Sequence, residues 1–252
     1  MKTLLELQNI SLNYQTTTDE IPAIKDLFFT CKDGEFTSII GPSGCGKTTI
    51  LSIIAGLIKP SQGRILIDGK PLDFSTKKSI GYMLQKDQLF PWRTIEKNVY
   101  LPLEINKVKN KESKDYANTL LDKYGLSKFK TKYPTQLSGG MRQRAALIRT
   151  LVFNPKLLLL DEPFSALDYQ TRLSVCDDVY RIIREEKKTA ILVTHDISEA
   201  ISMSDKIIVL TERPAKVKKV FYPEIEGDTP LKRRESKEFG VWFEKIFKEL
   251  HR

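Results

Sequence analysis

The sequence predicts an α/β fold in which helices cover a sheet with parallel strands. Three observations support this fold class. Apolar runs of strand length alternate with helical stretches, a glycine-rich loop directly follows the first buried run, and the N-terminal region has instead the pattern of antiparallel strands. With 252 residues, 40% of them hydrophobic, the chain is long enough to bury one α/β core.

The parallel sheet is expected to contain four buried strands, at residues 36–41, 156–162, 189–195 and 206–212. These short apolar runs are bounded by polar or glycine-containing segments, which is typical of strands buried on both faces. A helix is expected over 47–57, directly after the glycine-rich loop. A second helix is expected over 169–187, because its apolar residues fall mostly on one helical face.

Two further regions flank this predicted sheet. The first 35 residues and "GRILIDGKPL" are expected to form antiparallel strands, with Asp68 and Gly69 in a hairpin turn. Residues 88–151 are helical and lysine-rich in composition, which indicates an inserted helical subdomain. Residues 213–252 are expected to be a basic extension that ends in a helix near Phe239 to Leu250, so the main domain would comprise residues 1–212.

The net charge of +9 comes from two segments. Residues 106–132 carry +5 and residues 213–252 carry +4. Neither segment has the aromatic interleaving of a single-strand binder or a helix-turn-helix pattern, so no nucleic-acid partner is predicted. A solvated basic face and attraction to an anionic membrane surface both remain open.

The chain has no run of 18 or more uncharged apolar residues, and its N-terminus lacks the apolar region of a signal peptide. We therefore expect a cytosolic chain that does not span a membrane. Its three cysteines, Cys31, Cys45 and Cys176, lack metal-ligand spacing and suit reduced thiols. Because Cys45 lies close to a predicted helix N-terminus, a reactive thiolate is expected there, whereas the other two should react slowly.

The segment "GPSGCGKTT" at 41–49 satisfies the pattern G-x-x-x-x-G-K-[ST] between a buried strand and a helix. Such a loop lets backbone N–H groups wrap a triphosphate, because glycine presents no Cβ, and the helix N-terminus adds a positive dipole. Lys47 would bridge the β- and γ-phosphate oxygens, and the Thr48 hydroxyl would bind Mg²⁺. The alternative is an accidental turn before a helix.

The segment "LLLLDEP" supplies the acids that a phosphate loop requires. Asp161 ends a buried strand, where it would hold Mg²⁺, and Glu162 would polarise the attacking water. Because side chains alternate along a strand, the two carboxylates point differently and need not share a role. His195 ends the next buried strand and is a candidate γ-phosphate contact. The structural alternatives are that acids simply end strands and that His195 is a satisfied structural residue.

Together these residues closely resemble the ATP-binding cassette (ABC) ATPases, with a P-loop NTPase core, over about residues 3–212. Six segments carry the resemblance. "GPSGCGKTT" resembles the Walker A loop, "GYMLQKDQLFPW" the Q-loop and "LSGGMRQR" the signature motif. "LLLLDEP" resembles Walker B, "SALD" the D-loop and "THD" the switch histidine. Met141 stands where many members have Gln. This is typical of the importer branch for nitrate, sulfonate, taurine and bicarbonate, which "LTERPAKV" also resembles although the branch usually has Gly at Ala215.

The resemblance implies catalytic roles for Glu162 and His195. It also implies a set of ATP-binding residues, which are Tyr14, stacked on adenine, and Gly41, Pro42, Ser43, Gly44, Cys45, Gly46, Lys47, Thr48, Thr49, Gln85, Ser138, Gly139 and Gly140. The implied Mg²⁺ ligands are Thr48, Gln85 and Asp161.

A second glycine loop, 137–140, is redundant for a chain whose phosphate loop already binds one triphosphate. In the resembled family two cassettes face head to tail, and each signature loop contacts the γ-phosphate held by the other chain. The alternative is that Ser138 only caps a helix; capping and anion binding use the same N–H groups, so both are possible.

The resemblance therefore implies an ATP-hydrolysing motor at the cytoplasmic face of the membrane. It would work as a homodimer with separate permease subunits and an extracytoplasmic solute-binding protein. Phe90 and Trp92, beside Gln85, are expected to be exposed and to contact the permease; the alternative is that both pack inside the helical subdomain. The alternative function is a soluble cassette ATPase without a permease, but such proteins carry coiled-coil insertions or two cassettes in one chain. The solute is not disclosed by the sequence.

Overall fold

The computed structural model describes residues 2–15, 19–108 and 110–251. Its larger sheet has the strand order β10-β9-β3-β8-β7-β6. The strands are β3 (Phe36–Ile40), β6 (Ile80–Met83), β7 (Leu157–Asp161), β8 (Thr189–Val193), β9 (Lys206–Leu210) and β10 (Val217–Phe221). All neighbours pair in parallel except β10, which runs antiparallel to β9 at one edge. The predicted α/β class with a parallel sheet is confirmed.

The smaller sheet is antiparallel and has the order β2-β1-β4-β5. It contains β1 (Thr3–Gln15), β2 (Glu20–Lys32), β4 (Gln62–Ile67) and β5 (Lys70–Pro71). The turn between β4 and β5 has Asp68 and Gly69 at φ values of 54° and 76°. Both residues thus adopt the left-handed conformation that a two-residue hairpin requires, so the predicted turn is confirmed.

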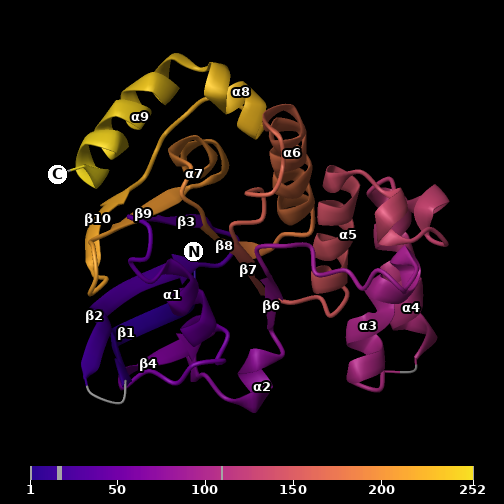
Figure 1. Ribbon diagram of the computed structural model, residues 1–252, viewed down its shortest axis with the longest axis horizontal. Coiled ribbons are helices and arrows are strands. Elements are labelled where there is room, and N and C mark those ends of the chain that lie inside the picture. The colour runs from indigo at the N-terminus through magenta and orange to yellow at the C-terminus, as the bar shows by residue number, and fades with distance from the viewer. Residues whose placement is uncertain (1, 16–18, 109, 252) are drawn as a thin grey trace.

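The helices fall into three groups (Figure 1). Helix α1 (Lys47–Ile54) lies between the two sheets. It ends three residues earlier than expected, and Gly56 follows at a φ of 68°. Helices α3 (Ile95–Ile105), α4 (Lys111–Lys123) and α5 (Gly139–Leu151) form a lobe at one side, which coincides with the helical region expected at 88–151. On the face of the larger sheet away from α1 lie α6 (Tyr169–Glu185), α7 (Ile197–Met203), α8 (Pro230–Glu235) and α9 (Lys237–Leu250). Helix α2 (Phe74–Lys77) is a single turn outside these groups.

Strand β7 separates two hydrophobic cores. Leu158 and Leu160 pack with the helices of the lobe and α6, whereas Leu157 and Leu159 pack with α1 and the antiparallel sheet. This alternation follows from the two-residue period of a strand. It also directs Asp161, two residues beyond Leu159, toward the side of the sheet on which α1 lies.

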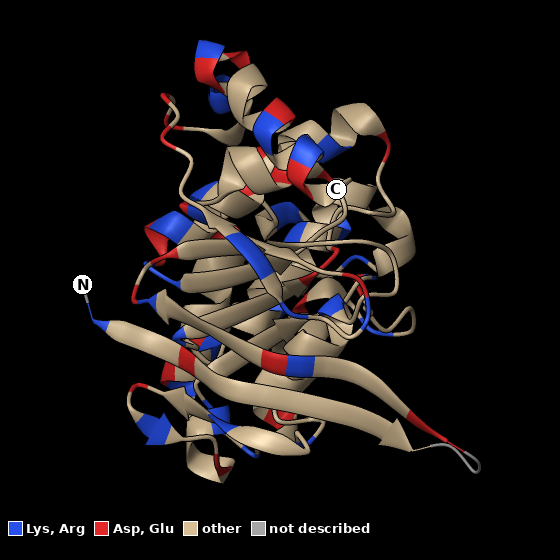
Figure 2. Cartoon of the chain, turned by 90° about the vertical axis from the view of Figure 1, so that its left-hand side faces the viewer, with Lys and Arg blue, Asp and Glu red and all other residues tan. Residues whose placement is uncertain are grey.

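The described part of the C-terminal region, residues 213–251, is integrated into the fold and ends in helix α9. Strand β10 joins the larger sheet, and Ile246 of α9 packs in a third core with residues of α7 and β9. Lys and Arg are interspersed with Asp and Glu on the side drawn in Figure 2, where no uniformly basic face appears. Among the described residues, no helix is both long enough and apolar enough to cross a membrane.

Candidate nucleotide-binding and hydrolysis site

The phosphate loop, residues 41–49, connects the end of β3 to α1. The Lys47 ammonium is buried and donates hydrogen bonds to the carbonyl oxygens of Gly41 and Pro42, both at 2.9 Å. Gly46 has a φ of 117°, a conformation that side-chain-bearing residues rarely adopt, and a Cβ at Gly41 would lie 3.0 Å from Leu210. Both glycines are therefore required by the loop itself, and the loop presents Lys47 at the N-terminus of α1.

Asp161 lies beside the first turn of α1, as the alternation along β7 requires. Its Oδ1 accepts a hydrogen bond from the Thr48 hydroxyl at 3.1 Å, and its Oδ2 accepts one from the Tyr82 hydroxyl at 3.2 Å. Burial raises the pKa of the Asp161 carboxyl, and burial together with this carboxylate raises the pKa of Tyr82 to about 12. A buried carboxylate next to a hydroxyl is a set of hard oxygen donors that suits Mg²⁺.

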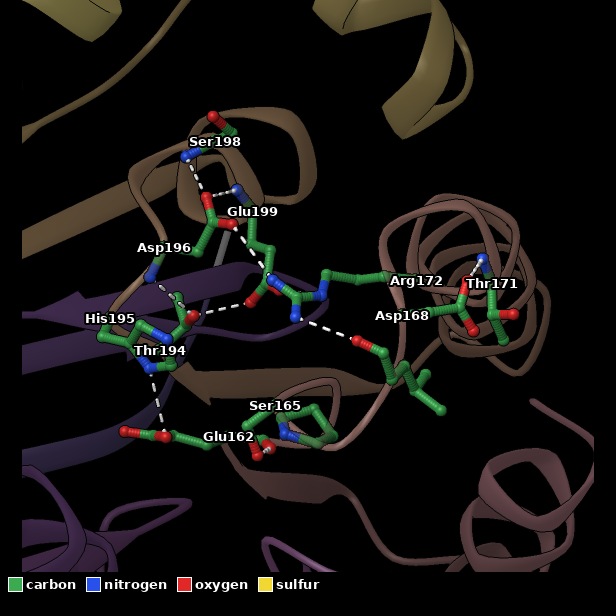
Figure 3. Close-up of polar contacts among 12 residues, drawn as sticks. Glu162, Ser165, Asp168, Thr171, Arg172, Thr194, His195, Asp196, Ser198 and Glu199 are labelled. Atoms are coloured by element: carbon green, nitrogen blue, oxygen red, sulfur yellow. Dashed lines mark hydrogen bonds and ion pairs between the residues drawn. The ribbon is translucent and has the colours of Figure 1, made fainter. Parts of the chain in front are cut away.

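Glu162, His195 and Gln85 meet at one point although they come from three distant segments. The His195 Nδ1 lies 3.2 Å from the Glu162 Oε2 (Figure 3), and the Gln85 amide donates to the same oxygen at 3.5 Å. Glu162 has a φ of 43°, and its backbone N–H donates to the Val193 carbonyl at 2.9 Å. This left-handed backbone turns the Glu162 side chain away from the direction of Asp161, so the two acids occupy different places.

The signature loop, residues 137–140, begins α5. The Ser138 hydroxyl accepts a hydrogen bond from the Met141 N–H at 3.3 Å, which makes Ser138 the N-cap. A Cβ at Gly139 would lie 2.9 Å from Leu167, and one at Gly140 would lie 2.7 Å from Val175. The glycines thus allow α5 to approach residues 165–168 and α6 closely. Ser138 therefore caps α5, as the alternative required. This cap uses the Met141 N–H, and the other N–H groups of the first turn of α5 could still bind an anion.

Tyr14 lies at the end of β1, next to the start of α1. Its hydroxyl is 3.2 Å from the Thr49 hydroxyl, and 38% of the residue is exposed.

Arg213, which follows β9 in the sequence, contacts the phosphate loop and donates a hydrogen bond to the Gly44 carbonyl at 2.9 Å. Arg213 was not among the predicted site residues, because only the folded chain brings residue 213 to residue 44.

Further residues that sequence reasoning missed hold the Q-loop in place. Arg149 of α5 donates to the carbonyls of Asp87 and Gln88, and Arg142 forms an ion pair with Asp87 at 3.0 Å. Arg142 and Arg149 are seven residues apart, a spacing that places both on one helical face, and this signal could have identified them from the sequence.

Tyr82 was not predicted either, because strand β6 was not predicted and only its pairing with β7 places this tyrosine beside Asp161.

The expected reactivity of Cys45 was wrong. Only 1% of the residue is exposed, and burial raises the pKa of its thiol in spite of the nearby Lys47 ammonium. Desolvation therefore outweighs the positive helix terminus. The same cause raises the pKa of Cys31 to about 11 and also raises that of Cys176, as expected for slowly reacting thiols.

Phe90 and Trp92 stack on each other with ring centroids 4.9 Å apart. Trp92 is 71% exposed and Phe90 is 37% exposed. The alternative that both pack inside the helical lobe was therefore wrong for Trp92, and the pair forms an aromatic surface next to the Q-loop.

Comparison with known proteins agrees with this geometry. The pattern of the family described as ABC transporter matches residues 24–165. The chain belongs to this family. The chain is 49% identical over 249 residues to an uncharacterized ABC transporter ATP-binding protein of Bacillus subtilis. This match covers 98% of this chain and 95% of the relative. It is also 38% identical to an aliphatic sulfonates import ATP-binding protein of Bacillus cereus, covering 98% and 96% of the two chains.

Solved ABC structures share the fold. A cassette solved as a dimer in a post-hydrolysis state with ADP and Pi has a TM-score of 0.73 and 34% identity, covering 87% of this chain and 98% of that one. The cbiO1 protein from Clostridium perfringens, part of the ABC transporter complex cbiONQ, has a TM-score of 0.77 and 29% identity, covering 94% and 93%. The chain is therefore an ATP-binding ABC ATPase with the cassette fold.

Proposed function

We propose that this ABC ATPase is the motor subunit of an importer that couples ATP binding and hydrolysis to uptake of a small anion, such as a sulfonate, taurine or nitrate. The observation that carries the proposal is the meeting of Gln85, Glu162 and His195 at one carboxylate oxygen beside the Asp161 and Thr48 pair. The anion class is supported by the named relatives. In addition to the sulfonates import protein, the chain is 42% identical to a nitrate import ATP-binding protein of Synechococcus elongatus over 77% of this chain and 29% of that one.

In the proposed mechanism the phosphate loop binds the triphosphate through the backbone of residues 41–46. Lys47 exchanges the carbonyls of Gly41 and Pro42 for phosphate oxygens, and Tyr14 stacks on the adenine. Glu162 accepts a proton from the attacking water, and His195 holds Glu162 and contacts the γ-phosphate. Thr48, Asp161 and Gln85 would hold Mg²⁺, which neutralises phosphate charge when bound.

The signature loop acts on a second nucleotide in this proposal. The contacts described for Gly139 and Gly140 are with residues 165–168 and α6, and Ser138 caps α5. Two chains facing head to tail would place these N–H groups on the γ-phosphate held by the partner, since a helix N-terminus favours an anion. The dimer would close on ATP and open after hydrolysis.

A groove between the sheet and the helical lobe is the proposed contact for a helix of a membrane permease. It has a volume of about 560 Å³ and is lined by the following residues of α2, β6, α3 and α5 and their connections: Phe74, Tyr82, Pro102, Val108, Arg149 and Phe153. Two of these reach the site directly. Tyr82 donates to Asp161, and Arg149 holds the Q-loop carbonyls. A helix pressing into this groove would therefore act on both the Mg²⁺ ligand and Gln85.

The experiment is co-purification with a candidate permease in detergent, followed by transport in vesicles. We expect Trp92→Ala to lower solute uptake roughly tenfold while the ATPase rate changes less than twofold, because the exposed Trp92 ring stacks on Phe90 and is not part of the contacts described for Lys47, Asp161 and Glu162. Tyr222→Ala is the matched control, since Tyr222 is 60% exposed and lies beyond β10. Crosslinks from residue 92 that capture only soluble proteins would support the soluble ATPase instead.

A further inference from the structure

Arg172, on the first turns of α6, contacts two segments at once (Figure 3). Its Nη2 donates to the Leu167 carbonyl at 3.0 Å, and its Nη1 lies 3.7 Å from a carboxylate oxygen of Asp196. Its Nε is buried without a hydrogen bond and lies 4.0 Å from Glu199. One guanidinium therefore joins the turn at 165–168 to the residues that follow β8, and a planar fork is suited to contacts in several directions.

Asp196 and Glu199 fix the backbone on both sides of His195. Asp196 caps α7 by accepting hydrogen bonds from the N–H groups of Ser198 and Glu199. The Thr194 hydroxyl donates to the Glu199 carboxylate at 2.6 Å and accepts from the Asp196 N–H at 3.0 Å. The switch segment, residues 194–196, is thus held by the acids that Arg172 approaches.

The other end of this connection leads to the signature loop. Leu167 packs so closely on Gly139 that a Cβ there would lie 2.9 Å away, and the Leu167 carbonyl is the group that Arg172 binds. The Leu167 backbone N–H in turn donates to the Phe164 carbonyl at 3.1 Å, two residues beyond Glu162. A continuous set of contacts therefore runs from Gly139 through Leu167 and Arg172 to the segment that carries His195.

We propose that Arg172 is a positioning residue for hydrolysis: it joins the 165–168 turn to the switch segment within one chain, so that a nucleotide gripped by the signature loop sets the position of the same chain's His195 on Glu162. Occupancy of the partner's phosphate loop would thereby reach the chain's own hydrolysis site. This inference rests on the proposed roles of the signature loop and His195.

The test uses the ring signals of the two histidines, because the chain contains only His195 and His251. In ¹H–¹⁵N spectra of the full chain, Arg172→Ala should shift the His195 ring signals and leave those of His251 in place, since His251 stacks on Phe247 at the end of α9. Arg181→Ala is the matched control on the same helix, because the side chain of Arg181 is 59% exposed and pairs with Asp178, three residues earlier on α6. It should shift neither histidine.

Kinetics separate positioning from a general loss of structure. We expect Arg172→Ala to lower kcat roughly tenfold or more with an unchanged KM for MgATP, and to cause no further loss in a chain that already carries His195→Ala. Arg172→Lys, which keeps the charge but cannot span both segments, should fall in between. If Arg172→Ala unfolds and moves both histidines, the same comparisons are made with Arg172→Lys.

Unmoved His195 signals in the folded variant, or losses that multiply in the double variant, would overturn the role of Arg172. The proposed function fails by a different result, since a His195→Ala enzyme with wild-type turnover would remove His195 from catalysis whatever the spectra of Arg172→Ala show.

Discussion

Asp161 shows how one residue combines a stability cost with a function. The residue is 5% exposed and burial raises the pKa of its carboxyl, which means that the folded chain disfavours ionisation of this group. The hydroxyls of Thr48 and Tyr82 offset part of this cost. Such a buried, incompletely compensated charge is expected where a cation is to be bound.

Replacing Asp161 with Asn should therefore stabilise the metal-free protein while it abolishes ATP hydrolysis. The cost is complete above the raised pKa of the folded state and shrinks as the pH falls from that pKa toward the ordinary value of 3.8, below which the carboxyl is neutral in both states. We expect Asp161→Asn to gain about 1 kcal/mol in the free energy of unfolding at pH 7, a gain that disappears as the pH falls toward 4. Urea unfolding without Mg²⁺ measures this, and a pH-independent difference would contradict it.

For single residues, some features could be predicted from the sequence and others could not. Lys47, Thr48, Asp161 and Glu162 could be singled out because each belongs to a short motif whose neighbours lie next to it in sequence, and their roles stay predictions. The raised pKa of Cys45 was not predictable, since the burial that causes it comes from packing that no local pattern encodes.

At the scale of the element, the segment between Gln85 and α3 is organised by one buried side chain. Asn98 is fully buried, donates to the carbonyls of Phe90, Arg93 and Thr94, and accepts from the Phe90 N–H at 2.7 Å. Because these groups have few alternatives in the interior, Asn98 fixes the backbone that presents Phe90 and Trp92.

We expect Asn98→Ala to lower the free energy of unfolding by about 2 kcal/mol, since three partly buried carbonyls and the Phe90 N–H lose their partner. Thermal or urea unfolding measures this loss. Asn106→Ala is the control, because the exposed Asn106 amide donates only to the Pro102 carbonyl, and the loss there should be below about 0.5 kcal/mol. Equal losses in the two variants would show that Asn98 does not organise the segment.

Strands and helices were predicted correctly where their sequence pattern was long or strongly apolar. This holds for strands β3, β7, β8 and β9 and for helix α6. Strand β6 has only four residues, one of them a partly buried tyrosine, and β10 has two adjacent lysines between its valines, so neither pattern distinguishes a strand from a loop. Their places in the sheet come from pairing with neighbours that are distant in sequence.

At the scale of the whole molecule, the presence of a signature loop in addition to the phosphate loop is explained if two chains share two sites. The chain's own phosphate loop, acids and switch histidine form one half of such a site. The signature loop is held instead against Leu167 and α6. The proposed head-to-tail dimer explains this division, and the similarity to a cassette solved as a dimer supports it.

The amount of occluded ATP in mixed dimers shows whether two chains share each site. Both chains carry Glu162→Gln to trap ATP, Lys47→Ala disables a phosphate loop and Ser138→Arg disables a signature loop. When the two lesions are on different chains, a head-to-tail dimer has both in one site and keeps the other whole. When both are on one chain, each site is damaged once. We expect about one occluded ATP per purified heterodimer in the first pairing and near zero in the second, because each shared site needs a working loop from both chains. The reverse order, or equal occlusion in the two pairings, would rule out sites that are shared between the two chains.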